Sequence, residues 1–111
     1  MKVAYVFSST NSQKILNNMI IPQIREERHG AEVAGMFFFM DNAFFLLDGT
    51  EMGARLQELH DKTGLLLMAC DQCAYERGIA DKLVPGAHIG CFPHLYASLR
   101  GAGGVDQVIT L

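Results

Sequence analysis

The sequence has 111 residues and a formal net charge of −3; 50% of its residues are hydrophobic and 19% are charged. This length fits one domain over residues 1–111, and the lack of a basic cluster argues against nucleic-acid binding. No segment reaches the roughly 18 apolar residues that a membrane span requires. The apolar content instead predicts a parallel sheet buried on both faces, or surface buried between subunits.

The first half of the chain is expected to alternate between strands and helices. A β-rich run over residues 3–7 ends in the turn-prone segment 8–12, and a helix with one apolar side follows it. Pro22 lies inside that helical pattern and predicts a kink or a break close to it, and Gly30 is a candidate C-cap. The continuous apolar run 31–40 then predicts a central strand that is covered on both faces.

The second half continues the alternation. Thr50 is a candidate N-cap for a helix that Gly64 can end, and residues 65–69 form a third apolar strand. A short helix is expected to begin at Cys70, and a later helix has Pro93 in its first turn. Two more extended segments are expected, over residues 88–91 and 105–111. The pattern predicts an α/β fold with a doubly wound, mostly parallel sheet of about five strands and helices on both faces.

The three cysteines restrict the class of protein further. Their odd number argues against a disulfide scaffold and favours reduced, reactive or metal-bound thiols. The apolar run after Lys2 stops at Ser8 and lacks the small-residue cleavage signature of a signal peptide, so we interpret it as a strand. We therefore expect a cytoplasmic protein.

Cys70 is the leading candidate for a reactive residue. It lies where the third strand ends and a helix begins, and ligands of open α/β sheets bind beyond the carboxyl ends of the strands. The free N–H groups and the dipole at a helix N-terminus favour an anion, which predicts a lowered pKa for the Cys70 thiol. Cys73 follows by about one helical turn, so its sulfur is expected near that of Cys70. The alternative for each cysteine is a small buried hydrophobic residue.

A metal site is an alternative use of the same residues. Cys70, Cys73, Cys91 and His94 have the spacing C-x2-C-x17-C-x2-H, which resembles that of zinc sites. The expected helix directly after a buried strand weakens this match, because structural zinc pairs usually lie on tight knuckles. His94 could instead tune or protonate the Cys91 thiol.

Asp41 and Arg77 are accessory candidates. Asp41 ends the second apolar strand, on the same expected edge of the sheet as Cys70, although turn formation is the favoured explanation for it. Arg77 follows Cys70 by seven residues and could hold an anionic sulfur species, although a solvated helix face explains it more simply. No G-x-G-x-x-G motif and no P-loop is present, and no cofactor is expected.

Residues 65–79, LLLMACDQCAYERGI, resemble the corresponding segment of the DsrE/DsrF/TusD-like family. The shared pattern is an apolar strand, a cysteine, a short helix, and Arg-Gly seven and eight residues after the cysteine. The turn 40–44, MDNAF, is similar to the family's strand-end aspartate followed by apolar residues. Because order and length also agree, the resemblance covers nearly the whole chain as a single DsrE-like domain. It implies a doubly wound α/β fold and homo- or hetero-oligomers, commonly trimers or hexamers.

The resemblance also implies a function. Several members act in sulfur relay, in which a cysteine accepts sulfane sulfur as a persulfide from a donor protein and passes it to a partner thiol. The matching residue is Cys70, so the chain would be a sulfurtransferase-like carrier. Cys73 and the Cys91-x-x-His94 element depart from the common pattern and leave a redox dithiol or a metal site open. Cys73 or Cys91 could also resolve the persulfide, and a non-catalytic subunit of an assembly is the remaining alternative.

Overall fold

A computed structural model describes the whole chain, residues 1–111. Its elements are, in chain order, β1 (Lys2–Phe7), α1 (Ser12–Ile15), the π-helix η1 (Leu16–Ile20), α2 (Ile21–Arg25), β2 (Glu32–Phe38), the 3₁₀ helix η2 (Met40–Leu46), α3 (Glu51–Thr63), β3 (Leu66–Cys70), α4 (Asp71–Glu76), β4 (Ala87–Gly90), α5 (Phe92–Gly101) and β5 (Gln107–Thr110).

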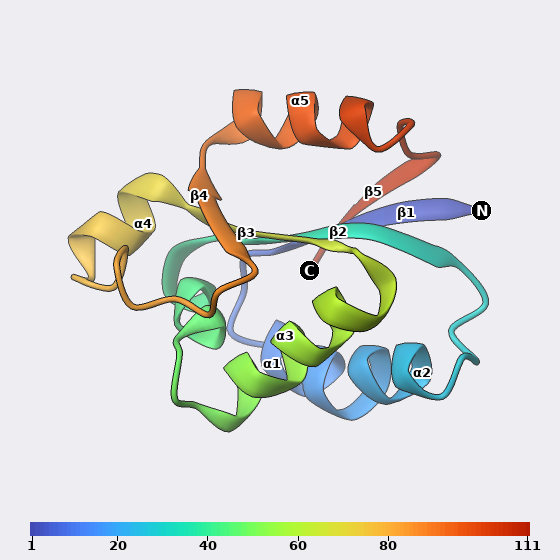
Figure 1. Cartoon of the computed structure of the whole chain (residues 1–111), viewed down its shortest axis with the longest axis horizontal. Helices are drawn as coiled ribbons and strands as arrows, with labels where there is room; N and C mark the ends of the chain where they lie inside the picture. Colours follow the sequence, from blue (N-terminus) through green and yellow to red (C-terminus); the bar gives the residue numbers. More distant parts are fainter.

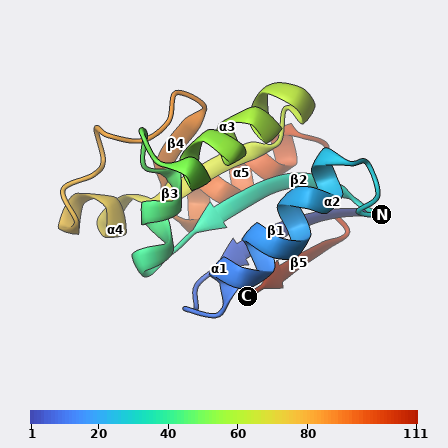
Figure 2. The same ribbon diagram turned by 90° about the horizontal axis from the view of Figure 1, so that it is seen from below.

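All five strands form one parallel sheet in the order β4-β3-β2-β1-β5. The helices α1, α2 and α3 lie on one face of this sheet, and α5 lies on the other (Figure 1). The view from below shows α4 beyond the carboxyl end of β3, away from both helical layers (Figure 2). The predicted doubly wound α/β fold is therefore confirmed.

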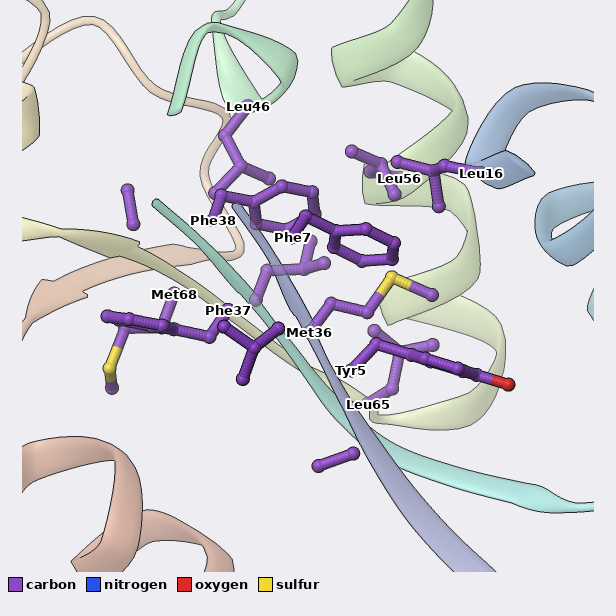
Figure 3. Packing of buried hydrophobic residues seen from close by; sticks show 14 of the residues in the cluster. Tyr5, Phe7, Leu16, Met36, Phe37, Phe38, Leu46, Leu56, Leu65 and Met68 are labelled. Carbon is purple, nitrogen blue, oxygen red and sulfur yellow. The ribbon is translucent and has the colours of Figure 1, made fainter. Parts of the chain in front are cut away.

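The aromatic run of β2 supplies both faces of the core. Phe38 stacks on Phe7 of β1 with ring centroids 5.2 Å apart, on the face that α3 covers, while Phe37 lies 5.5 Å from Phe92 of α5. Figure 3 shows the first pair beside Leu56 of α3 and shows Phe37 on the other side of the strands. Since consecutive strand residues point to opposite faces, a continuous apolar run is what a strand covered on both sides requires.

The first helical segment departs from regular α geometry just before Pro22. The backbone N–H of Ile21 bonds to the carbonyl of Leu16, five residues earlier, which makes η1 a π-helix. Proline has no N–H to donate and its ring clashes with the preceding turn, so the chain widens there while the helix continues as α2. The sequence predicts a kink or a break near Pro22; the structure has a π-helical turn there and no break in the helix. The expected C-cap at Gly30 is wrong, because α2 ends at Arg25 and Gly30 lies in the turn before β2 with φ +81°.

Most of the other boundaries follow their expected signals. The Oγ1 of Thr50 accepts the N–H of Gly53 at 3.0 Å and caps α3, and Gly64 ends that helix in a left-handed conformation with φ +77°. Pro93 lies in the first turn of α5, which begins one residue earlier at Phe92. The strand predicted over 105–111 is shorter, and three of the four residues of β5 are exposed. No helix has both the length and the apolar character needed to cross a membrane.

Candidate functional site

Two strand-to-helix junctions place the three cysteines at the carboxyl edge of the sheet. Cys70 is the last residue of β3 and the N-cap of α4, and Cys73 lies in the first turn of that helix. On the adjacent strand, Gly90 pairs with Cys70, and the next residue, Cys91, is the N-cap of α5. All three thiols are free. The structure thus brings Cys70 and Cys73 together, and it places Cys91 on the neighbouring strand end.

The Cys70 thiol is buried, with 3% of the residue exposed. Burial raises the pKa of this thiol, and the adjacent Cys73 side chain raises it further through a hydrogen bond and through charge repulsion. The N–H groups of Cys73 and Gln72 act in the opposite direction, but none reaches the sulfur with the geometry of a regular capping hydrogen bond. The predicted lowering of the Cys70 pKa is therefore wrong, because loss of hydration outweighs the N-terminus of a helix of only six residues.

Cys73 is also buried, at 4% exposure, but it has a donor of its own. Its Sγ accepts the backbone N–H of Met40 at 3.1 Å. Met40 follows the extended Phe39 and starts η2 with φ +57°, a left-handed conformation that is unusual for a side chain with a Cβ. The turn at Met40 takes the chain away from the sheet, and the Met40 amide still faces the Cys73 sulfur. Strain of this kind persists only where surrounding contacts hold it.

An ion pair between Asp41 and Arg77 supplies such contacts. The Oδ1 of Asp41 accepts Nε of Arg77 at 2.9 Å and lies 2.8 Å from its Nη2. The Nη1 of the same guanidinium donates to the carbonyl of Cys73 at 3.2 Å. The hydrogen bond to Asp41 raises the pKa of Arg77, and the charge of Cys73 adds to this effect. Arg77 thus connects η2 to α4. Turn formation is an incomplete explanation of Asp41, and a solvated helix face is an incomplete explanation of Arg77.

A buried polar pair holds the other side of η2. The Oγ of Ser12 and the Oδ1 of Asn42 lie 2.7 Å apart, and both residues are almost fully buried. The Nδ2 of Asn42 donates to the carbonyl of Phe39 at 3.2 Å. These bonds satisfy polar groups that would otherwise be costly to bury, and they tie the segment that contains Met40 to the start of α1.

Cys91 and His94 lie at the N-terminus of α5, where they cap the helix. The two residues form a capping box, in which the Nδ1 of His94 accepts the backbone N–H of Cys91 at 3.1 Å. No group of three or more histidine, cysteine, aspartate or glutamate side chains has a geometry that could hold a metal ion. The zinc-like spacing is therefore explained by two separate helix N-termini, and the four residues of the alternative metal site do not converge.

Met40 is a residue of the site that the sequence does not reveal. It takes part through its backbone amide and its positive φ, and both are independent of side-chain chemistry. Its partner lies 33 positions further along the chain. Only the pairing of β2 with β3 brings the two segments together, so no local pattern could have identified this contact.

Comparison with known proteins places this architecture among known folds. The model of the DsrE/DsrF-like family matches residues 1–102. The crystal structure of the YchN protein from E. coli has a TM-score of 0.69 at 21% identity and covers 99% of this chain and 97% of its own. MTH1491 from Methanobacterium thermoautotrophicum, a protein of unknown function, has a TM-score of 0.69 at 15% identity, with 99% and 98% covered. BT1422 from Bacteroides thetaiotaomicron, also of unknown function, has a TM-score of 0.67 at 13% identity, with 99% and 94% covered. No curated protein sequence matches the chain.

Proposed function

Because the chain belongs to the DsrE/DsrF-like family, we propose that it carries sulfane sulfur as a persulfide on Cys70 and passes that sulfur to a partner thiol. The observation that supports this role is the position of Cys70, at the carboxyl edge of the sheet and at the N-cap of α4. This edge is where open α/β sheets bind their ligands. The N–H groups of the first turn of α4 favour a negative charge on sulfur.

The transfer consists of two thiol exchanges. The Cys70 thiolate attacks the outer sulfur of a donor persulfide, and the donor leaves as a thiolate. An acceptor thiolate then attacks the outer sulfur of the Cys70 persulfide, and Cys70 leaves as the thiolate. Because burial raises the pKa of Cys70, little of the thiolate is present at neutral pH. Loading by this route becomes faster as pH rises toward that pKa.

The burial of Cys70 favours donor and acceptor proteins that dock at this edge and open the segment over the thiol. A thiol with 3% exposure reacts only when the surrounding segment opens or when a partner displaces it. Donor and acceptor proteins are therefore part of the proposal, as is assembly of the chain into a trimer or hexamer. Exposed aromatic residues on α5, Phe92 and Tyr96, support such assembly. The reduced state of all three cysteines fits a cytoplasmic location.

Mass spectrometry tests the carrier role. Protein with Cys73→Ser and Cys91→Ser, in which Cys70 is the one remaining thiol, is incubated without oxygen with cysteine persulfide. We expect a gain of about 32 Da, the mass of one sulfur atom, and loss of that gain when a thiol acceptor is added. The variant that also carries Cys70→Ser should gain nothing. Equal adducts on both proteins, or none on either, would overturn the proposal.

A second candidate is a subunit that lends a docking surface to an assembly without transferring sulfur. The observation that favours it is the burial of Cys70, at 3% exposure, because burial raises the pKa of the thiol and an activated nucleophile usually has a lowered one. This candidate requires a normal oligomer and no sulfur adduct, so the same mass measurement separates it from the carrier role.

A further inference from the structure

The surroundings of the two buried thiols differ although they lie three residues apart. Cys73 accepts a full backbone hydrogen bond from Met40, at 3.1 Å, and the Arg77 guanidinium lies on its carbonyl, where its positive charge attracts a thiolate. Cys70 has no donor outside the first turn of α4. Cys73 therefore has a hydrogen-bond donor from a second element of the fold, and Cys70 has none.

The position of Cys73 is held from two elements. The ion pair of Asp41 with Arg77 joins the start of η2 to the end of α4, and Met40, the residue before Asp41, has a left-handed conformation with φ +57°. We call Met40, Asp41 and Arg77 the clasp. A strained backbone persists only where its surroundings hold it, and such residues cluster at functional sites. The strained conformation of Met40 beside the Asp41–Arg77 ion pair therefore indicates a role beyond closing the turn.

We propose that Cys73 resolves the persulfide formed on Cys70, and that Asp41 and Arg77 position it for that step. The inference rests on the proposed function, since it needs a loaded Cys70. When no acceptor removes the sulfur, the Cys73 thiolate attacks the Sγ of Cys70. A disulfide forms between the two cysteines, the bond to the outer sulfur breaks, and hydrosulfide leaves with the bonding electron pair.

In this step the two cysteines reduce the sulfane sulfur, and atoms and electrons balance. One donor persulfide and the reduced protein yield one donor thiol, one hydrogen sulfide and the disulfide form of the protein. The sulfane sulfur gains two electrons, and the two cysteines lose them. Two equivalents of a low-molecular-weight thiol, or one dithiol, return the protein to its reduced form by ordinary exchange.

The geometry favours this bond cleavage. The side chains of Cys70 and Cys73 lie close together at the start of α4, so the inner sulfur of a Cys70 persulfide is within reach of Cys73. A thiolate with a high pKa is a poor leaving group, and burial gives Cys70 such a pKa. Hydrosulfide, the conjugate base of a stronger acid, therefore leaves more readily than Cys70. Cys91 is a weaker candidate because its capping box engages it within the first turn of α5.

The test follows sulfide release and intact mass after one equivalent of cysteine persulfide is added without oxygen. The intact protein should release about one equivalent of sulfide and lose about 2 Da, as expected for a disulfide. Cys73→Ser and Cys73→Ala should keep an adduct of about 32 Da and release no sulfide. The matched control Cys91→Ser should behave as the unchanged protein.

The outcomes separate the two proposals. If the unchanged protein keeps its adduct as long as Cys73→Ser does, or if Cys73→Ser releases sulfide at the same rate, the resolving role is overturned while the carrier role stands. If Cys73→Ser takes up no sulfur, the carrier role fails, and the resolving role fails with it.

A second measurement tests the clasp. Arg77→Gln and Asp41→Asn should load Cys70 as before but release sulfide several-fold more slowly. Arg77→Gln, which removes a positive charge near Cys73, should also move the pH profile of release to higher pH, whereas Asp41→Asn, which removes a negative charge, should not. Arg77→Lys, which keeps the charge, should recover part of the rate. If Arg77 had only a structural role, Arg77→Gln would leave the pH profile of release where it is, and Arg77→Lys would release sulfide no faster than Arg77→Gln. A pH profile of Arg77→Gln identical to that of the unchanged protein would overturn the positioning role.

Discussion

The β3–α4 and β4–α5 junctions lie next to each other at the carboxyl edge of the sheet, and each has a cysteine at the N-cap of a helix. At the first junction Cys70 is buried, a second thiol lies beside it, and its pKa is raised. At the second junction Cys91 is partly exposed and belongs to a capping box with His94. The same local sequence pattern, a strand followed by a cysteine and a helix, thus leads to two different environments.

The difference arises from what packs over each junction. η2 and the side chain of Arg77 cover the first turn of α4 and exclude water from both of its cysteines. The first turn of α5 has no such cover, and Phe92, Pro93 and His94 are all exposed. A helix N-terminus alone therefore does not activate a thiol here, because burial has the larger effect.

Alkylation should show the largest contrast between the junctions. A buried thiol reacts with iodoacetamide only through local opening, and an opening free energy of about 3 kcal/mol slows it on the order of a hundredfold. We expect Cys91 to be modified first, and Cys70 and Cys73 to be modified on the order of a hundredfold more slowly. Peptide mass mapping of the native protein measures the three rates. In denaturant the contrast should disappear. Equal native rates would contradict the packing described for α4.

Gly90→Ala should affect stability most at the second junction. A Cβ at this position would lie 2.8 Å from the Cβ of His94 and 3.2 Å from the Sδ of Met68. The first turn of α5 would have to move, and overpacking of this kind costs about 1–3 kcal/mol of unfolding free energy. Chemical denaturation measures this loss. Gly101→Ala is the control, because no atom lies near its added Cβ, and it should leave stability unchanged or slightly higher.

Stability at alkaline pH should sharpen the comparison at the first junction. Because the folded state raises the pKa of Cys70, the unfolded thiol ionises first, near pH 8.5. The unfolding free energy is therefore fully maintained below that pH and falls as pH rises through the folded pKa. Cys70→Ser should remove most of this decline between about pH 8.5 and 9.5, below the range of tyrosine. Cys91→Ser should keep it, and a decline that is the same in both variants would argue against a raised pKa.

The sheet could be predicted from the sequence because each strand is a compact apolar run. The expected strand 65–69 and the observed β3 differ by one residue at each end, and Thr50 and Gly64 bound α3 as expected. The last strand was predicted too long, because Val105 and Leu111 are apolar and lie next to β5 without joining it. Local pattern thus identifies elements better than it identifies their ends.

The environment of the candidate site could be predicted only in part. Cys70 and Cys73 lie together as their spacing indicates. The contact of Arg77 with Asp41 spans 36 positions and depends on which strands become neighbours. The zinc-like spacing had a simpler cause, since Cys91 and His94 at the N-cap and N3 positions satisfy a capping box.

The smallest expected effect concerns the capping role of Cys91. Serine is among the best N-cap residues and alanine is among the poorest, so the unfolding free energy of Cys91→Ser should exceed that of Cys91→Ala by about 1 kcal/mol. Chemical denaturation at neutral pH resolves the difference between the two variants. If both variants lose the same stability, the thiol contributes through packing and not through the cap. If neither loses any, the hydrogen bond from the Cys91 amide to His94, which both variants retain, is sufficient to hold the first turn of α5.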